Sequence, residues 1–165
     1  MKEKVFKYLK DLEIEFQIYD HPALYTCSDK EKYGLKIDGI KIKNLFLRNK
    51  NKKSFYLISM KEDKSVDLKK LALILNETKL SFANEEQLFS KLKITSGTVS
   101  LLNVTICEKD VIFIIDQDLI SDDKVCFHPN DNTATVTFSG IHIKRILNDC
   151  DVKYQFISLS SEKEK

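Results

Sequence analysis

A lysine and an asparagine stand side by side at the start of an apolar run, where their polar groups would lie at the edge of a buried core. Lys43 and Asn44 are followed at once by Leu45, Phe46 and Leu47. Such a run without alternation is typical of a strand covered on both faces. An ammonium group held against a core costs free energy unless it meets an anion or reaches solvent. The pair fits either a cation that holds an anionic substrate or a lysine that extends into solvent.

Both prolines of the chain follow a histidine, in His21-Pro22 and His128-Pro129. Proline fixes the backbone and donates no N–H, so each pair predicts a fixed turn at a strand end. Histidine also carries protons or donates hydrogen bonds near neutral pH. Both histidines are therefore candidate site residues, with ordinary turn residues as the alternative.

A loop of small polar residues surrounds Gly97, one of four glycines in the chain. Because no side chain blocks the approach, such a loop can present backbone N–H groups to a phosphate or to a developing oxyanion. An ordinary turn has the same composition. Further along, Thr133 and Ala134 enter a strand with small side chains, which suits either a tight wall beside a ligand or a simple alternating strand.

Several familiar site patterns are missing from the sequence. There is no P-loop, no dinucleotide glycine fingerprint, no Gly-x-Ser-x-Gly and no paired Cys or His ligand set. We expect no cofactor and no metal. An enzyme with this sequence would activate water by positioning and electrostatics.

The composition is that of one soluble globular domain of 165 residues, with 42% hydrophobic and 32% charged residues. The net charge of +2 means that nucleic acid would be bound through a local patch. Four widely spaced cysteines indicate reduced thiols, and no signal peptide or membrane span is visible. We expect a cytoplasmic protein without membrane association.

Helical and strand patterns are interspersed along the chain, which predicts an α+β domain with a mixed sheet. Asp67 and Asn84 are predicted helix N-caps, and Ser28 is predicted to begin a short helix. Expected strands include 45–47 and 55–60, which form a hairpin, and 80–82, 111–115, 125–127, 133–138 and 154–157. We expect one domain over residues 1–157 and a polar tail over 158–165.

Taken in order, these motifs resemble the YbaK/ProX superfamily, the free-standing homologues of the editing domain of bacterial prolyl-tRNA synthetase. The likeness is greatest to the ProXp-ala branch, also called PrdX-like. The resemblance implies a single domain with a mixed, mostly antiparallel sheet or barrel and surrounding helices. The matching segments are His21-Pro22, Thr26, Gly39, the run from Lys43 to Arg48, Val66 to Lys69, Lys79 to Ala83, Gly97 to Ser100, His128-Pro129 and Asn132 to Val136.

The resemblance implies a cytoplasmic trans-editing enzyme that hydrolyses the ester of mischarged Ala-tRNA(Pro). Its implied partner is the acceptor end of tRNA(Pro), with prolyl-tRNA synthetase as a further candidate, and its oligomeric state is left open. A synthetase pocket built for proline rejects the smaller alanine only weakly, because a methylene is worth about 1–3 kcal/mol. A second, small pocket that admits alanine would restore fidelity.

The same resemblance assigns roles to individual residues. Lys43 would hold the acceptor end, Asn44 would orient substrate or water, and the loop at Gly97 would direct N–H groups toward the ester carbonyl. The candidate substrate-binding residues are His21, Thr26, Thr98, Ser100, His128, Thr133 and Ala134.

The chain departs from the superfamily pattern at three places. Ser96 stands where a proline usually precedes the glycine, and Lys41 stands where a histidine is often found. Residues 101–104 read Leu-Leu-Asn-Val instead of Pro-Phe-Gly-Leu. Two alternatives therefore stay open: a deacylase for Cys- or Ser/Thr-charged tRNA, and a non-catalytic homologue that senses tRNA or an amino acid.

Overall fold

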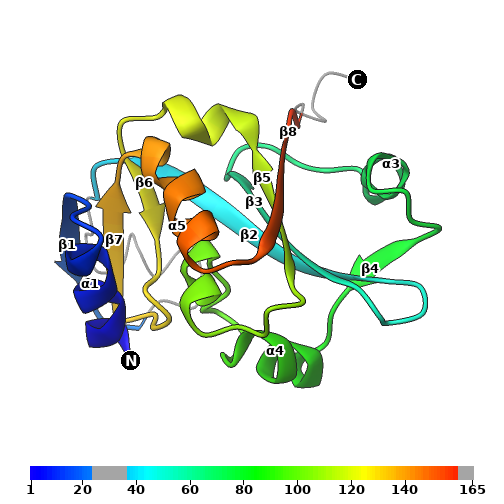
Figure 1. Ribbon diagram of the computed structural model, residues 1–165, viewed down its shortest axis with the longest axis horizontal. Helices are drawn as coiled ribbons and strands as arrows, with labels where there is room; N and C mark the ends of the chain where they lie inside the picture. The colour runs from blue at the N-terminus through cyan, green and yellow to red at the C-terminus, as the bar shows by residue number, and fades with distance from the viewer. Residues whose placement is uncertain (24–36, 160–165) are drawn as a thin grey trace.

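A computed structural model describes residues 1–23 and 37–159, in which eight strands form one mixed sheet (Figure 1). The order is β1-β7-β6-β2-β3-β5-β8, and β4 pairs with β2 beside this path. The strands are β1 (Phe16–Asp20), β2 (Ile40–Asn49), β3 (Phe55–Lys61), β4 (Leu80–Phe82), β5 (Ile112–Asp116), β6 (Val125–Phe127), β7 (Ala134–Phe138) and β8 (Lys153–Ile157).

The sheet confirms the predicted α+β class and its mixed character. Four pairings are antiparallel, namely β1–β7, β2–β3, β2–β4 and β6–β7, whereas β2–β6, β3–β5 and β5–β8 are parallel. Among the described strands the sheet is open, because β1 and β8 lie at the two ends of the order. The mostly antiparallel sheet is thus present as an open sheet instead of a closed barrel.

The long strand β2 sends alternate side chains into two separate hydrophobic clusters, as the period of a strand requires. Phe46 is buried in the larger cluster, and Leu47 is buried in the smaller one. This arrangement confirms that the apolar run is covered on both faces. The larger cluster also receives side chains from α1 (Lys2–Asp11), α4 (Glu85–Leu92) and α5 (Ile143–Asp149), and the smaller one from α3 (Leu68–Ile74).

The predicted N-cap residues Asp67 and Asn84 mark the observed starts of α3 and α4. The Asp67 carboxylate accepts hydrogen bonds from the first-turn N–H groups of α3, and Asn84 forms a capping box with Gln87 at the start of α4. The sequence analysis missed two short 3₁₀ helices, η1 (Leu101–Thr105) and η2 (Gln117–Ser121), whereas η3 (Gly140–His142) opens the helix that the sequence predicts from Gly140 to Asn148. The helix predicted from Ser28 lies outside the described residues.

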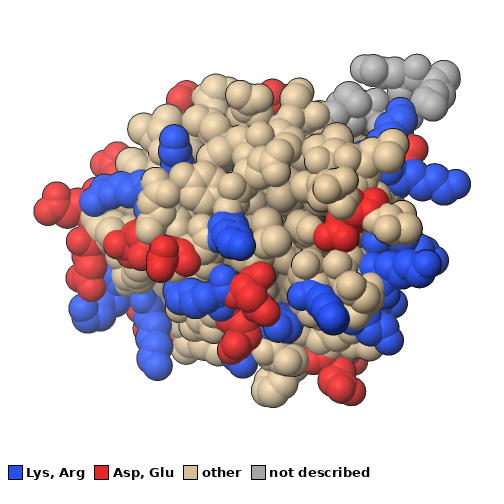
Figure 2. Space-filling model, turned by 45° about the vertical axis from the view of Figure 1, so that its right-hand side comes forward, with Lys and Arg blue, Asp and Glu red and all other residues tan. Residues whose placement is uncertain are grey.

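The C-terminal packing extends to Leu159, which is buried in the smaller cluster and accepts a hydrogen bond from Lys64. Charged side chains of both signs are interspersed over much of the face shown in Figure 2. Within the described ranges, none of the helices has the length and apolar character required to cross a membrane.

Candidate active-site pocket

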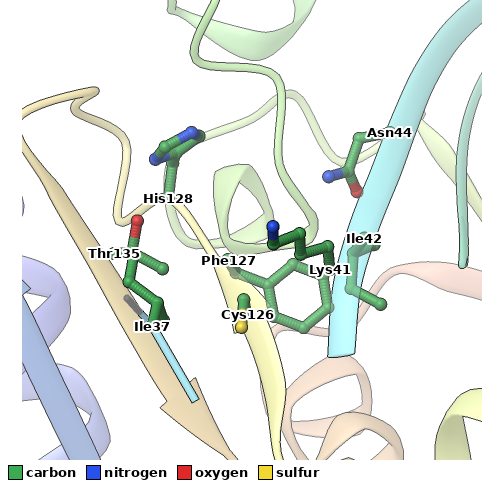
Figure 3. A pocket seen from close by; sticks show the side chains of 8 residues that line it. All are labelled: Ile37, Lys41, Ile42, Asn44, Cys126, Phe127, His128 and Thr135. Atoms are coloured by element: carbon green, nitrogen blue, oxygen red, sulfur yellow. The ribbon is translucent and has the colours of Figure 1, made fainter. Parts of the chain in front are cut away.

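A pocket of about 60 Å³ lies where β2 and β6 separate (Figure 3). The two strands pair in parallel only at Ile40 and Lys41, opposite Val125 and Cys126. Beyond that point β2 continues along β3, while β6 ends and the chain turns toward β7. The fork between them leaves a hollow lined by Ile37, Lys41, Ile42, Asn44, Cys126, Phe127, His128 and Thr135.

One edge of β2 is open beside this pocket. On that edge β6 pairs with residues 40–41 and β4 with residues 47–49, so no described strand pairs with residues 42–45. The N–H of Ile40 and the C=O of Phe46 both form hydrogen bonds across this edge. By the period of two, the backbone N–H and C=O groups of Ile42 and Asn44 face the same way. The pocket wall therefore offers backbone donors and acceptors to a bound group.

The Asn44 side chain is held in a defined orientation by its partner across the hairpin. Ser59 lies directly opposite Asn44 on β3, and the Ser59 hydroxyl donates a 2.7 Å hydrogen bond to Asn44 Oδ1. Because Oδ1 is engaged, the amide nitrogen is the group that Asn44 presents to the pocket. Figure 3 shows this nitrogen directed toward the side of His128. Ser59 is fully buried, and nothing in the local sequence marked it as a site residue.

The two His-Pro turns meet on the other side of the pocket. His128 Nδ1 lies 3.0 Å from the carbonyl oxygen of Ala134, so this nitrogen carries the proton and Nε2 is the acceptor of the neutral ring. The His21 ring lies 6.1 Å from the His128 ring, and its Nε2 is 2.9 Å from Thr135 Oγ1. His128 and Thr135 line the pocket, whereas His21 and Ala134 lie one layer behind and hold them in place.

The two lysines of β2 have different surroundings. The Lys43 ammonium donates a hydrogen bond to the backbone carbonyl of Lys64, and Lys43 does not line the pocket. Lys41 does line it, and in Figure 3 its ammonium extends into the space between His128 and Asn44. Because the pocket lies against the edge of β2, side chains from both faces of the strand can reach it.

The loop at Gly97 lies outside the pocket and is tied to the His128 turn. Gly97 is exposed with φ of +94°, a conformation that suits glycine, and Thr98 and Ser100 are buried. The Asn103 amide donates to the Thr98 carbonyl and to Asn130 Oδ1, at 3.2 and 2.7 Å. The buried Asn103 therefore anchors this loop, in which Ser96 stands where the superfamily usually has a proline.

The remaining candidates are Thr133 and Thr26. The Thr133 hydroxyl donates to Asp131 at 2.6 Å and accepts from Lys2 at 2.9 Å, away from the pocket. The hydrogen bond from the Thr133 hydroxyl lowers the pKa of the Asp131 carboxyl. Thr26 lies outside the described residues. Of the candidates that are described, the structure therefore brings Asn44 and His128 together in the pocket, and it adds Lys41 and Thr135.

A model of the family of aminoacyl-tRNA editing domains matches residues 21–146. The chain belongs to this family. Its membership confirms the resemblance to the YbaK/ProX superfamily and makes the protein an enzyme of the aminoacyl-tRNA hydrolase class.

Two relatives and one solved structure extend the comparison. The editing domain is 37% identical over 149 residues to the prolyl-tRNA editing protein ProX of Acetoanaerobium sticklandii, covering 88% of this chain and 90% of that protein. It is 32% identical over 140 residues to prolyl-tRNA synthetase associated domain-containing protein 1 of Xenopus laevis, covering 82% and 83%. A crystal structure described as a candidate trans-editing enzyme for prolyl-tRNA synthetase superposes with a TM-score of 0.68 at 15% identity, over 96% and 97% of the chains. At 15% identity, the match to this crystal structure supports the fold of the chain.

No group of three or more His, Cys, Asp or Glu side chains within residues 1–23 and 37–159 of the editing domain is placed to hold a metal ion. The polar groups of the pocket are the backbone amides of β2, the Asn44 amide, the Thr135 hydroxyl, the His128 imidazole, the Cys126 thiol and the Lys41 ammonium. This set can donate hydrogen bonds to an ester and contact an anion.

The cysteines of the editing domain are expected to differ in reactivity. Burial raises the pKa of the Cys107 thiol to about 12 and also raises the pKa of Cys150, whereas Cys126 is half-buried and lines the pocket. Since the thiolate is the reactive form, iodoacetamide at pH 8 should alkylate Cys126 well before Cys107 and Cys150. Peptide mapping against time tests this order, and equal rates for all three in the folded protein would contradict it.

Proposed function

We propose that this editing domain hydrolyses the ester of Ala-tRNA(Pro) in trans, in the compartment where tRNA(Pro) is charged. The observation that carries the proposal is the small pocket at the fork of β2 and β6, which combines apolar walls with the polar groups of Asn44, His128 and Thr135, in a chain of the editing family. Its volume of about 60 Å³ compares with roughly 10–15 Å³ needed for one water molecule on the same scale. On this scale the pocket has room for a small aminoacyl group such as alanine, and the comparison with Pro-tRNA(Pro) in the assay below tests whether proline is excluded.

In the proposed reaction, water attacks the carbonyl carbon of the ester that joins alanine to the terminal ribose. The carbonyl oxygen gains negative charge, and the Asn44 amide nitrogen is oriented to donate a hydrogen bond to it. The C–O bond to the ribose then breaks, and the ribose oxygen takes up a proton. The products are free alanine and tRNA(Pro).

The histidine side of the pocket has a positioning role in this proposal. His128 donates through Nδ1 to the Ala134 carbonyl, which fixes the plane of the ring at the pocket wall. Thr135 donates to His21 Nε2 in the neutral state of that ring, so its hydroxyl oxygen keeps acceptor capacity for the substrate α-ammonium group. These contacts would place the aminoacyl group against the open edge of β2.

The direct test is a deacylation assay with purified protein on Ala-tRNA(Pro) and Pro-tRNA(Pro). We expect alanine to be released well above the spontaneous rate and Pro-tRNA(Pro) to be spared. Cys-, Ser- and Thr-charged tRNAs in the same panel test the alternative substrates. Release of none of these amino acids above background, with the tRNA still bound, would favour the non-catalytic homologue.

A further inference from the structure

We propose that Asn103 is a positioning residue that acts through Asn130 to hold the His128-Pro129 turn, and with it the His128 ring, at the wall of the pocket. Its part in catalysis rests on the proposed function, whereas the positioning itself does not. The Asn103 amide nitrogen in η1 donates a 2.7 Å hydrogen bond to Asn130 Oδ1. Asn103 is fully buried and Asn130 is 6% exposed, so water competes little for this bond.

The polar atoms of the Asn103 side chain all have partners. The amide nitrogen also donates to the Thr98 carbonyl at 3.2 Å, and Oδ1 accepts from the Ser100 N–H at 2.8 Å. Two donated bonds and one accepted bond fix which way the amide faces. One side chain thus joins residues 98–100 to Asn130. Asn103 lies in the stretch where the chain departs from the superfamily pattern, so the resemblance does not imply this bridge.

Asn130 is held at both ends of its side chain by the same short helix. Its Oδ1 accepts from Asn103, and its amide nitrogen donates to the Thr105 hydroxyl at 3.1 Å. Its φ of +62° is a left-handed conformation, which asparagine adopts more readily than most residues. These contacts clamp Asn130 against η1 and set the direction in which the chain leaves Pro129.

The position of His128 makes this clamp matter for the pocket. The strand β6 ends at Phe127, which pairs with Val136, so His128 lies one residue beyond the strand ladder. Pro129, with its fixed φ, links it to Asn130. The clamp therefore sets the far end of a short, stiff connection whose near end carries the ring at the pocket wall (Figure 3). Without the clamp, the bond from His128 Nδ1 to the Ala134 carbonyl should loosen.

The experiment observes the His128 ring directly. The chain has three histidines, so long-range ¹H–¹⁵N spectra of the labelled full chain can resolve each ring, and substitution of each histidine by glutamine assigns them. Asn103→Ala and Asn130→Gly break the bridge from its two sides, and glycine keeps the left-handed backbone. Asn130→Asp keeps an acceptor for the Asn103 amide. Deacylation of Ala-tRNA(Pro) and thermal unfolding are measured in parallel.

Asn49→Ala is the matched control for loss of a buried asparagine. Asn49 lies at the end of β2, where its side chain accepts from the Lys53 and Ser54 N–H groups and donates to Glu77. It does not line the pocket. Asn49→Ala and Asn103→Ala should each lower Tm by about 6 °C, so they separate a loss of stability from a change at His128.

We expect the wild type to show His128 with its proton on Nδ1. Asn103→Ala and Asn130→Gly should each shift the Nδ1 signal toward that of a nitrogen without a proton, and the double variant should add no further shift, because both remove one bridge. Asn130→Asp and Asn49→Ala should match the wild type. In turnover, Asn103→Ala should lower kcat about tenfold and change KM by less than about twofold, as for a displaced positioning group.

An unchanged His128 Nδ1 signal in Asn130→Gly would overturn the proposal, and this variant decides alone if Asn103→Ala does not fold. An equal shift in Asn49→Ala would also overturn it, because the signal would then follow general loosening of the fold. The spectra are recorded without substrate. If the wild type releases no alanine, the proposed deacylation fails, and the spectra still decide whether Asn103 positions His128.

Discussion

Replacing Asn44 by alanine should lower kcat/KM for Ala-tRNA(Pro) by about 100-fold, because loss of one oxyanion donor typically costs 10²–10³ in rate. Ser59 holds Asn44 Oδ1 at 2.7 Å, so the donor is already oriented before substrate binds. The loss should appear in kcat, since the hydrogen bond strengthens as the carbonyl oxygen becomes charged. Single-turnover deacylation measures it directly.

Ser59→Ala is the companion variant. It keeps the Asn44 amide but removes the hydroxyl that orients it, so we expect a smaller loss of about tenfold, with a stability cost of about 1 kcal/mol for the hydrogen bond. Asn148→Ala, on the exposed face of α5, is the control and should be as active as the wild type. Full activity of Asn44→Ala would show that Asn44 does not stabilise the reacting ester.

Replacing Lys64 by methionine should lower the free energy of unfolding by about 3 kcal/mol, because it leaves a buried carboxylate without its cation. The Lys64 ammonium contacts Asp116, which is fully buried, at 2.7 Å, and it also contacts Asp118 at 2.8 Å and the Leu159 carbonyl at 2.7 Å. For a chain of this size the loss corresponds to a fall in Tm of about 10 °C. Thermal unfolding followed by circular dichroism measures it.

The stability that Lys64 adds through its ion pairs with Asp116 and Asp118 depends on pH. The hydrogen bond from Lys64 lowers the pKa of Asp118, so the stability it adds is present above the ordinary value of 3.8 and is lost as the pH falls through the lowered value. Burial works against the charged form of Lys64, but hydrogen bonds with Asp116 and Asp118 raise its pKa, so its contribution is lost only as the pH rises above 10.5.

Because Lys64→Met removes the hydrogen bond that lowers the pKa of Asp118, the difference in stability from the wild type should shrink as the pH falls through that lowered value. Lys153→Met is the control for the loss of one exposed lysine. A fall in Tm of less than about 2 °C for Lys64→Met at pH 7 would mean that Asp116 is satisfied in another way.

Local parts of the fold were predictable because their causes are local. Asp67 and Asn84 begin helices since their side chains accept hydrogen bonds from N–H groups two or three residues ahead. The run through Phe46 and Leu47 predicted a strand covered on both faces, because alternate side chains enter different clusters. The 3₁₀ helix from Leu101 was missed although Ser100 and Asn103 form a local capping box at its start, because its five residues are too few to show a helical period.

The sequence by itself determined the chemical groups, the local helices and strands, and membership of the editing family. Only the tertiary structure decided which of these groups meet in a pocket. The sequence favoured Lys43 over Lys41, yet Lys41 lines the pocket, and Ser59 orients Asn44 from the opposite strand. The reason is physical: the pocket exists because β2 and β6 part after two paired residues, and that pairing depends on segments far apart in the chain.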